Sequence, residues 1–318
     1  MIENLPDWPI FGLVEDVRLA LAQAVAAGEP IALATIVALD GGGPRPVGTQ
    51  MAVTPTRVAG FLSGGCLEGD VVAHAPEVIG GGAPKRLVYG EGSPWPDIRL
   101  LCGARVDVLL ERLSADDPAL ATLLRLTGAR QPAAWVSDGA RRACGPADRP
   151  PEAWPGAFSR TYQPAPRLVV LGSDPSALAI ADLGARSGFE TTLVRPRGPL
   201  APPPLQGVAY RRDAPDVALA AIGIDAWTAV AVATHDAELD HAALAQALPS
   251  EAFYVGALGA RRRVGDRKAL LAAAGLNAAT VARLHTPIGL DIGGKAPWEV
   301  AVAVIAQITA ERHRLRLA

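Results

Sequence analysis

The chain has 318 residues, which is too long for one ordinary hydrophobic core and sufficient for two domains. Half of the residues are hydrophobic and 19% are charged, a balance typical of folded globular proteins and not of disordered ones. The formal net charge of -2 gives no overall positive field, which argues against nucleic acid or an anionic membrane as a partner.

Three cysteines, Cys66, Cys102 and Cys144, are too few and too scattered for a disulfide framework. The first residues lack the basic region and apolar run of a signal peptide, and the apolar stretch near the end is too short to span a bilayer. We therefore expect a cytoplasmic protein with reduced thiols. A zinc site is not expected, because the sequence has no Cys-x-x-Cys pair and its five histidines are scattered.

The first half of the chain mixes helices with short strands, as judged from the spacing of apolar residues. Pro76 is expected to interrupt the helix that starts near Leu67. The predicted helices cover residues 14–27, 67–79 and 120–126, and the predicted strands cover 31–37, 50–54, 57–62, 86–89 and 104–110. These elements predict a mixed α/β domain over residues 1–143.

Residues 144–166 are rich in proline and poor in periodicity, which predicts an extended linker. Beyond them, strands and helices alternate over residues 167–318. The predicted strands are 167–171, 190–194, 208–210, 227–233 and 253–255, and the predicted helices are 176–186, 217–222, 239–248, 262–274 and 298–312. Such alternation predicts a Rossmann-like, doubly wound parallel sheet.

The most informative stretch of the first half is the loop Ser63-Gly64-Gly65-Cys66, which stands between a predicted strand and a predicted helix. Small residues allow the backbone to turn sharply and to point several N–H groups at one anion. The helix start adds the positive end of its dipole. A cysteine at that place is expected to have a lowered pKa, and its thiolate can bind a soft metal or carry a sulfur atom.

The ordinary alternative for each cysteine is a small buried apolar side chain. We accept that interpretation for Cys144 and favour a functional role for Cys66, which has small and polar neighbours in a loop. For Cys102, which Gly103 follows at a strand start, the two interpretations have similar weight.

The second half departs from the dinucleotide-binding pattern Gly-x-Gly-x-x-Gly at two points. Only Gly172 is in place, and Asp174 would meet a pyrophosphate as a like charge. Arg195 ends the second strand, where an acidic residue would recognise a ribose, although an arginine there can bind the 2′-phosphate of NADP. We therefore expect NAD(P) binding to be weakened or lost.

His235 and Asp236 follow the fourth strand of this half, at the edge where open α/β sheets bind their ligands. His235 could carry a proton or contact a cofactor, whereas Asp236 and Asp240 could cap the next helix. Three arginines, residues 261–263, open another helix and are most often a solvated surface. Asp291 precedes the last helix and is a candidate for a cleft between the domains.

Three successive blocks of the first half resemble the amino-terminal domain of the XdhC/CoxI family. They are residues 41–51 (GGGPRPVGTQM), 60–68 (GFLSGGCLE) and 101–103 (LCG). The resemblance continues through residues 234–236 (THD), 254–262 (YVGALGARR), 286–293 (TPIGLDIG) and 297–299 (PWE). It thus covers nearly the whole chain in order.

The resemblance implies a molybdenum cofactor carrier that protects the cofactor, supports its sulfuration and delivers it to a xanthine dehydrogenase-type apoenzyme. It implies a chaperone in preference to an enzyme, with a cysteine desulfurase as a further partner. A homodimer is expected because dimers are the default for soluble proteins of this kind. Two alternatives stay open: an NAD(P)-dependent oxidoreductase, which the second domain alone would suggest, and a cysteine-dependent sulfur-transfer enzyme, which would also use Cys66.

On this resemblance, Cys66 is assigned to the molybdenum or its terminal sulfur, and Gly64, Gly65 and Arg45 to the phosphate or the pterin. Glu68 is assigned either to a pterin amine or to the first turn of its helix, and Arg45 could equally be a solvated loop charge. The remaining candidate cofactor-binding residues are Ser63, Cys102, Gly103, Gly172, His235, Asp236 and Asp291.

Overall fold

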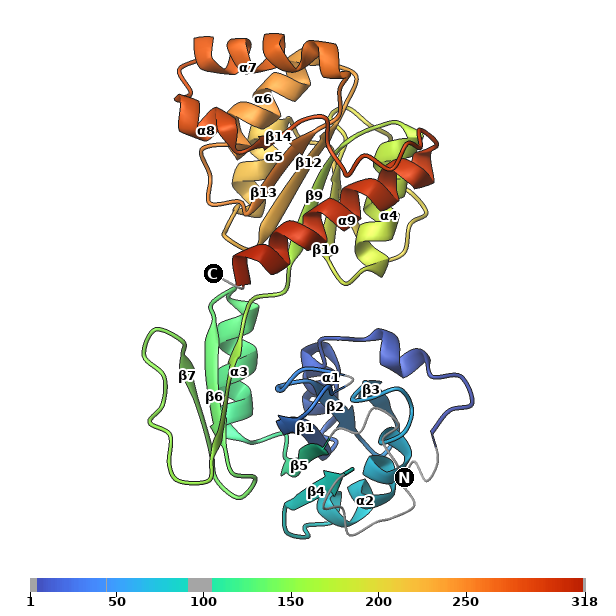
Figure 1. Cartoon of the computed structure of the whole chain (residues 1–318), viewed down its shortest axis with the longest axis vertical. Coiled ribbons are helices and arrows are strands. Elements are labelled where there is room, and N and C mark those ends of the chain that lie inside the picture. The colour runs from blue at the N-terminus through green and yellow to red at the C-terminus, as the bar shows by residue number, and fades with distance from the viewer. Residues whose placement is uncertain (1–4, 44, 91–104, 317–318) are drawn as a thin grey trace. The chain divides into compact units, whose positions relative to one another are not determined.

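The computed structural model describes residues 5–43, 45–90 and 105–316. The chain forms two compact units, residues 1–164 and 165–318, which Figure 1 shows in blue to green and in green to red. Each unit has its own sheets and hydrophobic core.

The first unit is built on a five-stranded antiparallel sheet with the strand order β3-β2-β1-β5-β4. Its strands are β1 (Ile31–Asp40), β2 (Gln50–Val53), β3 (Val58–Gly60), β4 (Lys85–Tyr89) and β5 (Arg105–Leu113). The long central pair β1 and β5 aligns Ile31 with Leu113 and Asp40 with Arg105. All of these strands coincide with predicted ones to within a few residues.

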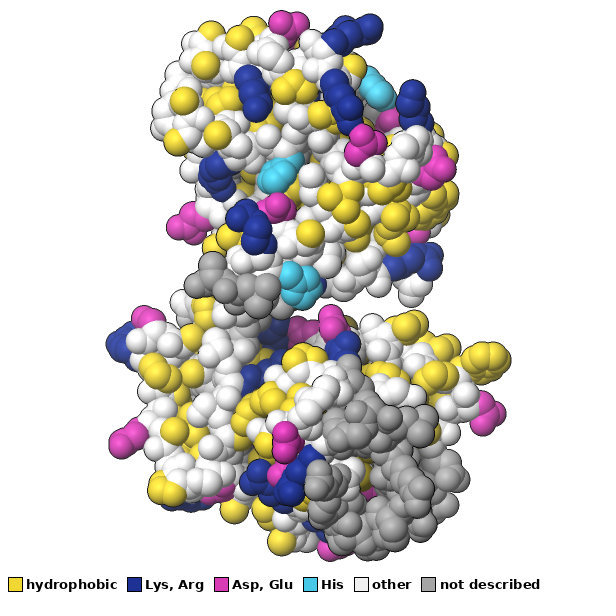
Figure 2. Space-filling view, viewed as in Figure 1, with side chains coloured by type: hydrophobic (Ala, Val, Ile, Leu, Met, Phe, Trp, Pro, Cys, Tyr) yellow, Lys and Arg dark blue, Asp and Glu magenta, His cyan; other side chains and the backbone are white. Residues whose placement is uncertain are grey.

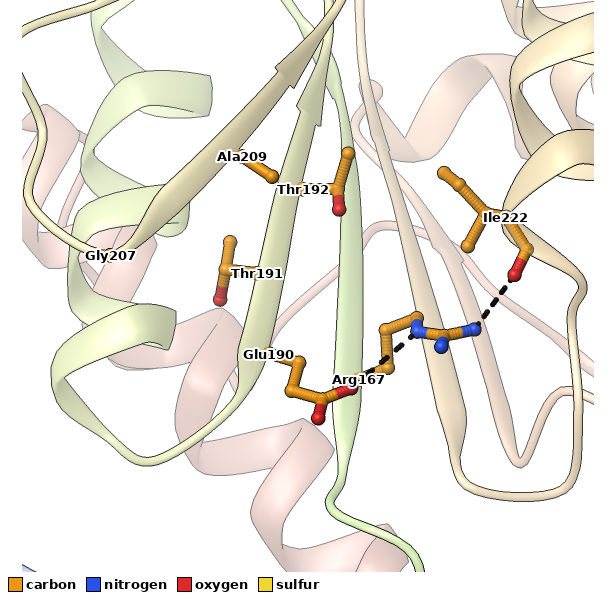
Figure 3. Close-up of a pocket in the computed structure, with 7 residues that line it drawn as sticks. All are labelled: Arg167, Glu190, Thr191, Thr192, Gly207, Ala209 and Ile222. Atoms are coloured by element: carbon orange, nitrogen blue, oxygen red, sulfur yellow. Dashed lines mark hydrogen bonds and ion pairs between the residues drawn. The ribbon is translucent and has the colours of Figure 1, made fainter. Parts of the chain in front are cut away.

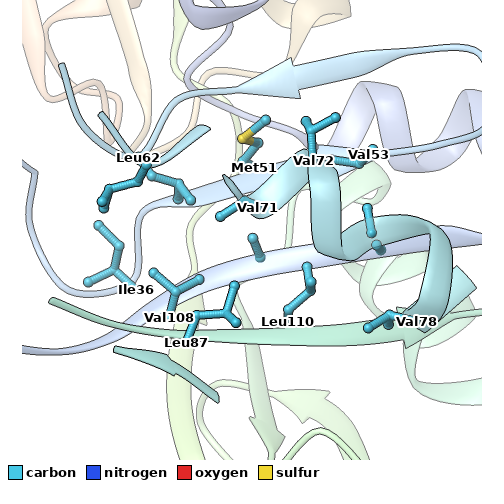
Figure 4. Close-up of a cluster of buried hydrophobic side chains, with 14 of the residues drawn as sticks. Ile36, Met51, Val53, Leu62, Val71, Val72, Val78, Leu87, Val108 and Leu110 are labelled. Atoms are coloured by element: carbon cyan, nitrogen blue, oxygen red, sulfur yellow. The ribbon is translucent and has the colours of Figure 1, made fainter. Parts of the chain in front are cut away.

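Alternate residues of β1 point into two different cores, as the period of a strand requires. Ala34 and Ile36 pack on α2 (Glu68–Ile79), in the cluster drawn in Figure 4. Ile31 and Leu33 face the opposite cluster, which contains residues of α1 (Arg18–Ala27) and α3 (Pro118–Gly128). Both faces of the sheet are therefore covered.

Helix α2 continues through Pro76 to Ile79, so the predicted interruption at this proline is wrong. A proline inside a helix removes one backbone hydrogen bond and is unfavourable. Val78 and Ile79, which follow it, are both buried in the core beneath the helix. Their burial offsets the cost of the proline.

A second sheet takes two of its strands, in whole or in part, from the segment 144–166 that composition predicts to be a linker. It is antiparallel, with the order β7-β6-β8, and consists of β6 (Ala133–Ser137), β7 (Arg142–Pro146) and β8 (Phe158–Tyr162). The buried side chains of Trp135 and Tyr162 fix this sheet to the first unit, whereas Pro150, Pro151 and Pro155 lie in the loop between β7 and β8. The prolines thus mark a loop between paired strands.

The second unit contains a six-stranded parallel sheet with the order β11-β10-β9-β12-β13-β14. Its strands are β9 (Arg167–Gly172), β10 (Glu190–Val194), β11 (Val208–Arg211), β12 (Thr228–Ala233), β13 (Tyr254–Ala257) and β14 (Leu284–His285). In order of sequence this is the 3-2-1-4-5-6 arrangement of Rossmann domains, and it confirms the predicted doubly wound sheet.

Helices cover both faces of this sheet. One face packs on α4 (Pro175–Arg186) and α9 (Pro297–Arg316), which lie side by side in Figure 1. The other face packs on α5 (Pro215–Ile222), α6 (Ala237–Ala247) and α7 (Val264–Ala273). The remaining short helices are η1 (Ile10–Leu13), η2 (Arg261–Arg263) and α8 (Ala278–Ala282). Within the described ranges, no helix combines the length and the apolar character needed to cross a membrane.

We predict that Leu110→Ala lowers the free energy of unfolding of the first unit by about 2–5 kcal/mol, because the substitution leaves a cavity in a closed core. Leu110 is 0% exposed on β5, whereas Leu13 on η1 is 84% exposed and supplies the control substitution Leu13→Ala. Urea-induced unfolding of the full chain measures both. Equal losses of stability for the two variants would contradict the assignment of Leu110 to the core.

Candidate functional site

The loop Ser63–Cys66 joins β3 to α2 and has a buried base and an exposed tip. Ser63 is buried, whereas Gly64, Gly65 and Cys66 are exposed. Helix α2 begins at Glu68, directly after Cys66 and Leu67, as the sequence predicted. The thiol of Cys66 is thus accessible from solvent at the start of a helix.

The carboxylate of Glu68 holds the base of this loop from beneath. Glu68 is 0% exposed. Its Oε1 accepts hydrogen bonds from the backbone N–H groups of Leu62 at 2.9 Å and Ser63 at 2.6 Å. Its Oε2 accepts from the Ser63 hydroxyl at 2.8 Å and from the N–H of Leu67 at 3.3 Å. These four bonds favour a structural role for Glu68 over the expected contact with a pterin amine.

Ser63 continues this network toward the tip of the loop. Its Oγ donates to Glu68 and accepts from the backbone N–H groups of Cys66 and Leu67, both at 3.1 Å. Among the described residues, no hydrogen-bond acceptor meets the N–H groups of Gly64 and Gly65. The predicted anion-binding loop therefore has two free amides at its tip.

The backbone at Gly65 has a φ of +100°, a conformation that side-chain-bearing residues rarely adopt. At both Gly64 and Gly65, a Cβ atom would meet no atom of the described residues within 4 Å. The described part of the chain therefore leaves the backbone of these two glycines accessible to a ligand.

The other predicted residues of the first unit do not join this loop in a described contact. Cys102 and Gly103 lie outside the described residues. Arg45 forms an ion pair with Glu15, with 2.8 Å between Nη2 and Oε1. Cys144 lies on β7 against the core, and burial raises the pKa of its thiol to about 11.

In the second unit, the position of Gly172 follows from close packing. A Cβ atom on Gly172 would lie 2.4 Å from the carbonyl oxygen of Ala233 and 2.6 Å from the Cβ of Ala177. Strand β9 thus approaches β12 and α4 too closely for any side chain at this point. Packing alone is sufficient to require a glycine there.

The amino end of α4 is occupied by a carboxylate of the chain itself. Asp174 Oδ1 accepts the N–H of Ala177 at 2.8 Å, and Pro175, the first helical residue, has no N–H to offer. Asp174 Oδ2 lies 3.0 Å from Nε2 of His235, which follows β12. Strands β9 and β12 meet where the strand order reverses, which is where Rossmann domains bind a pyrophosphate. The Asp174 carboxylate thus caps the helix end at which Rossmann domains hold that anion.

The neighbours of His235 have structural partners. Asp236 caps α6 by accepting the N–H groups of Glu238 at 2.9 Å and Leu239 at 3.2 Å. Asp240 is buried and binds the Thr234 hydroxyl at 2.6 Å and Nη2 of Arg267 at 2.7 Å. Burial raises the pKa of the Asp240 carboxyl despite these contacts. Capping is thus observed for Asp236, while the His235 side chain stays 77% exposed.

Asp291, the last candidate, is exposed and forms an ion pair with Arg261 of η2. Within the described ranges, no three His, Cys, Asp or Glu side chains converge as a metal-binding group. On the face shown in Figure 2, basic side chains of the second unit are interspersed with acidic and hydrophobic ones.

A shallow cavity of about 430 Å³ lies at the opposite end of the parallel sheet from Gly172 and His235. Figure 3 shows its lining at the starts of β9, β10 and β11. There Arg167 donates to the carbonyl oxygens of Ile222 at 3.0 Å and Gly223 at 2.9 Å. This arginine joins α5 to the sheet, and the cavity contains none of the predicted site residues.

We predict that iodoacetamide at pH 8 modifies Cys66 much faster than Cys144. Cys66 is exposed, whereas the raised pKa of about 11 leaves roughly one Cys144 thiol in a thousand ionised at that pH. Peptide mapping by mass spectrometry reads each cysteine separately, and labelling in denaturant is the control. Equal rates for the two cysteines in the folded protein would contradict their assigned surroundings.

We also predict that NAD and NADP cause no saturable change in the fluorescence of the six tryptophans, because Asp174 fills the pyrophosphate position. Asp174→Gly frees the amino end of α4 and is expected to bind either dinucleotide more tightly than the wild type does. Asp236→Gly, which removes the cap of α6, is the matched control. Tight binding of NAD or NADP by the wild type would show that Asp174 does not prevent dinucleotide binding.

Comparison with known proteins matches both units to one family. The family model described as "XdhC and CoxI family" matches residues 24–90, and the model described as "XdhC Rossmann domain" matches residues 168–308. A solved structure described as a xanthine dehydrogenase from Bacillus halodurans superposes with a TM-score of 0.73 over 93% of this chain and 96% of its own. At 23% identity, that likeness concerns the fold alone.

Two curated proteins are similar in sequence. The molybdenum cofactor insertion chaperone PaoD of Escherichia coli (strain K12) is 31% identical over 306 residues, which cover 94% of this chain and 90% of that protein. A protein of Bacillus subtilis (strain 168) described as a probable xanthine dehydrogenase subunit is 28% identical over 50% of this chain and 46% of its own length. The match to both domain models, together with a relative similar over nearly its whole length, shows that this chain belongs to the XdhC/CoxI family.

Proposed function

We propose that this chain binds the molybdenum cofactor at the loop Ser63–Cys66, protects it during sulfuration and delivers it to a xanthine dehydrogenase-type apoenzyme. A relative similar over 94% of the chain is named as a molybdenum cofactor insertion chaperone, which supports this class of function. The observation that carries the proposal is the exposed thiol of Cys66 at the tip of a loop whose base is held by buried Glu68.

The loop offers the two kinds of contact that the cofactor requires. A cysteine thiolate is a soft ligand, suited to molybdenum or to a bond with its terminal sulfur. The free N–H groups of Gly64 and Gly65 can donate to an anionic oxygen of the cofactor phosphate. Because Glu68 and Ser63 fix the loop before any ligand arrives, little ordering of the backbone opposes binding.

The second unit supports a carrier in preference to an NAD(P)-dependent oxidoreductase. The amino end of α4 already holds Asp174, and a dinucleotide would have to displace this carboxylate from Ala177 and His235. The exposed side chain of His235 remains a candidate contact for the cofactor or its partner.

We extend the proposal to partners and location. Sulfuration needs a sulfur donor, and we propose a cysteine desulfurase. The outer sulfur of its persulfide can pass to a thiol such as Cys66, while the donor cysteine leaves as a thiol. A reducing cytoplasm keeps that thiol available. We propose a homodimer as the assembly, since two-fold dimers are the commonest homo-oligomers of soluble proteins.

The experiment is purification of the full chain from cells that make molybdenum cofactor, followed by assay of released pterin and molybdenum. We expect Cys66→Ala to retain about tenfold less of both than the wild type, since an important metal-site contact is lost. Cys144→Ala, which alters a thiol packed against the core, is expected to retain wild-type amounts.

Equal retention by wild type and Cys66→Ala would overturn the assignment of Cys66. A persulfide trapped on Cys66 in cells that lack molybdopterin, with no pterin bound in normal cells, would favour a sulfur-transfer enzyme instead.

A further inference from the structure

Four arginines gather at the carboxyl ends of β10 and β11, outside the site described above. The turn Arg195–Gly198 follows β10, and Arg211 and Arg212 end and follow β11. Backbone hydrogen bonds join the two segments, from Arg195 N–H to the Arg211 carbonyl at 2.9 Å and from Arg197 N–H to the Arg212 carbonyl at 3.3 Å. The fold therefore keeps these residues together.

Gly198 contacts the side chains of two of these arginines. Arg212 donates from Nε to the carbonyl oxygen of Gly198 at 2.7 Å. The aliphatic part of Arg195 packs on the same residue, because a Cβ on Gly198 would be 2.9 Å from Arg195 Cδ and 2.3 Å from the Tyr210 hydroxyl. A side chain at position 198 would thus clash with Arg195 and Tyr210, so the turn places both arginines beside one glycine.

The turn also holds Arg197 in an unfavourable backbone conformation. The N–H of Gly198 donates to the Arg195 carbonyl at 3.0 Å, so Pro196 and Arg197 are the central residues of the turn. Arg197 has a φ of +55°, at the position where a type II turn favours glycine or asparagine. An arginine that keeps this position despite the strain suggests that its guanidinium is needed there.

The positive charge of this cluster is only partly neutralised by the chain. Arg211 donates from Nε to Asp213 at 2.9 Å. Throughout the described ranges, no acidic side chain pairs with Arg195, Arg197 or the terminal nitrogens of Arg212. Like charges held close together repel one another, and an anion placed among them removes that repulsion.

We propose that Arg195, Arg197 and Arg212 bind the dianionic phosphate of a phosphomonoester. Guanidinium groups match phosphate oxygens in charge and in planar, two-pronged geometry. The end of the second strand is also where Rossmann domains read the ribose, and an arginine there can take a 2′-phosphate. Because Asp174 fills the pyrophosphate position, the ligand is a compound with one terminal phosphate and not an intact dinucleotide.

This site is independent of the Cys66 loop, so it stands or falls separately from the proposed carrier function. The ordinary alternative is a solvated cluster of arginines without a ligand. Such a cluster explains neither the strained turn at Arg197 nor the close approach of Arg195 and Arg212 at Gly198.

The test is isothermal titration calorimetry of the full chain at low ionic strength with inorganic phosphate and, separately, with glycerol 3-phosphate. Both are expected to bind saturably at one site, whereas glycerol gives no binding heat. Arg195→Ala and Arg212→Ala are each expected to weaken binding about tenfold, through loss of a charge-assisted hydrogen bond. Arg263→Ala, an exposed arginine of the same unit, is expected to bind as the wild type does.

Arg197→Gly separates a ligand role from a structural one. Glycine relieves the positive φ, so the melting temperature is expected to rise while phosphate affinity falls. The proposal is overturned if neither phosphate compound binds saturably, if the alanine variants bind as the wild type does, or if Arg263→Ala loses as much affinity as they do. Binding of inorganic phosphate without glycerol 3-phosphate would overturn the assignment to a phosphomonoester.

Discussion

The structure of the Cys66 loop depends on one buried carboxylate. Glu68 is fully enclosed, and its two oxygens accept hydrogen bonds from the N–H groups of Leu62 before the loop, Ser63 at its start and Leu67 after it. A buried carboxylate is stable only when such donors surround it, and buried amides need such an acceptor. The hydrogen bonds that stabilise the buried Glu68 carboxylate therefore also fix the start of the loop, while Cys66 at its tip stays exposed.

In each unit a carboxylate of the chain accepts hydrogen bonds from backbone N–H groups near a helix start, but the consequence for ligand binding differs between the two units. In the first unit, Glu68 and Ser63 take the inner N–H groups of a glycine loop and leave those of Gly64 and Gly65 open to a ligand. In the second unit, Asp174 caps the amino end of α4 and pairs with His235. The Rossmann fold therefore has a carboxylate of the chain at the helix end where other Rossmann domains hold a pyrophosphate, and its function has to be argued from such contacts and not from the fold.

Local sequence patterns predicted the sheets better than they predicted the side-chain contacts of the site. The second unit could be predicted because each buried strand is a continuous apolar run followed by a helix with apolar periodicity. The end of β7 and the whole of β8 lie within residues 144–166, which were predicted to be a linker because prolines dominate their composition, although Pro150, Pro151 and Pro155 lie in the loop between these strands. The roles of Glu68 and Arg45 depend on the side chains and backbone around them. Glu68 reaches back to Leu62, and Arg45 pairs with Glu15, 30 residues away. Periodicity contains no information on such contacts.

Hydrogen exchange of the loop amides, measured by NMR, tests most directly whether Glu68 holds the base of the loop while the amides of Gly64 and Gly65 at its tip stay free. We expect slow exchange for Leu62 and Ser63, whose N–H groups donate to Glu68, and fast exchange for Gly64 and Gly65. All four are expected to exchange rapidly in Glu68→Ala, because no side-chain oxygen then accepts these bonds. Equal protection of all four amides in the wild type, or unchanged protection in Glu68→Ala, would contradict the assignment of Glu68 as the base of the loop.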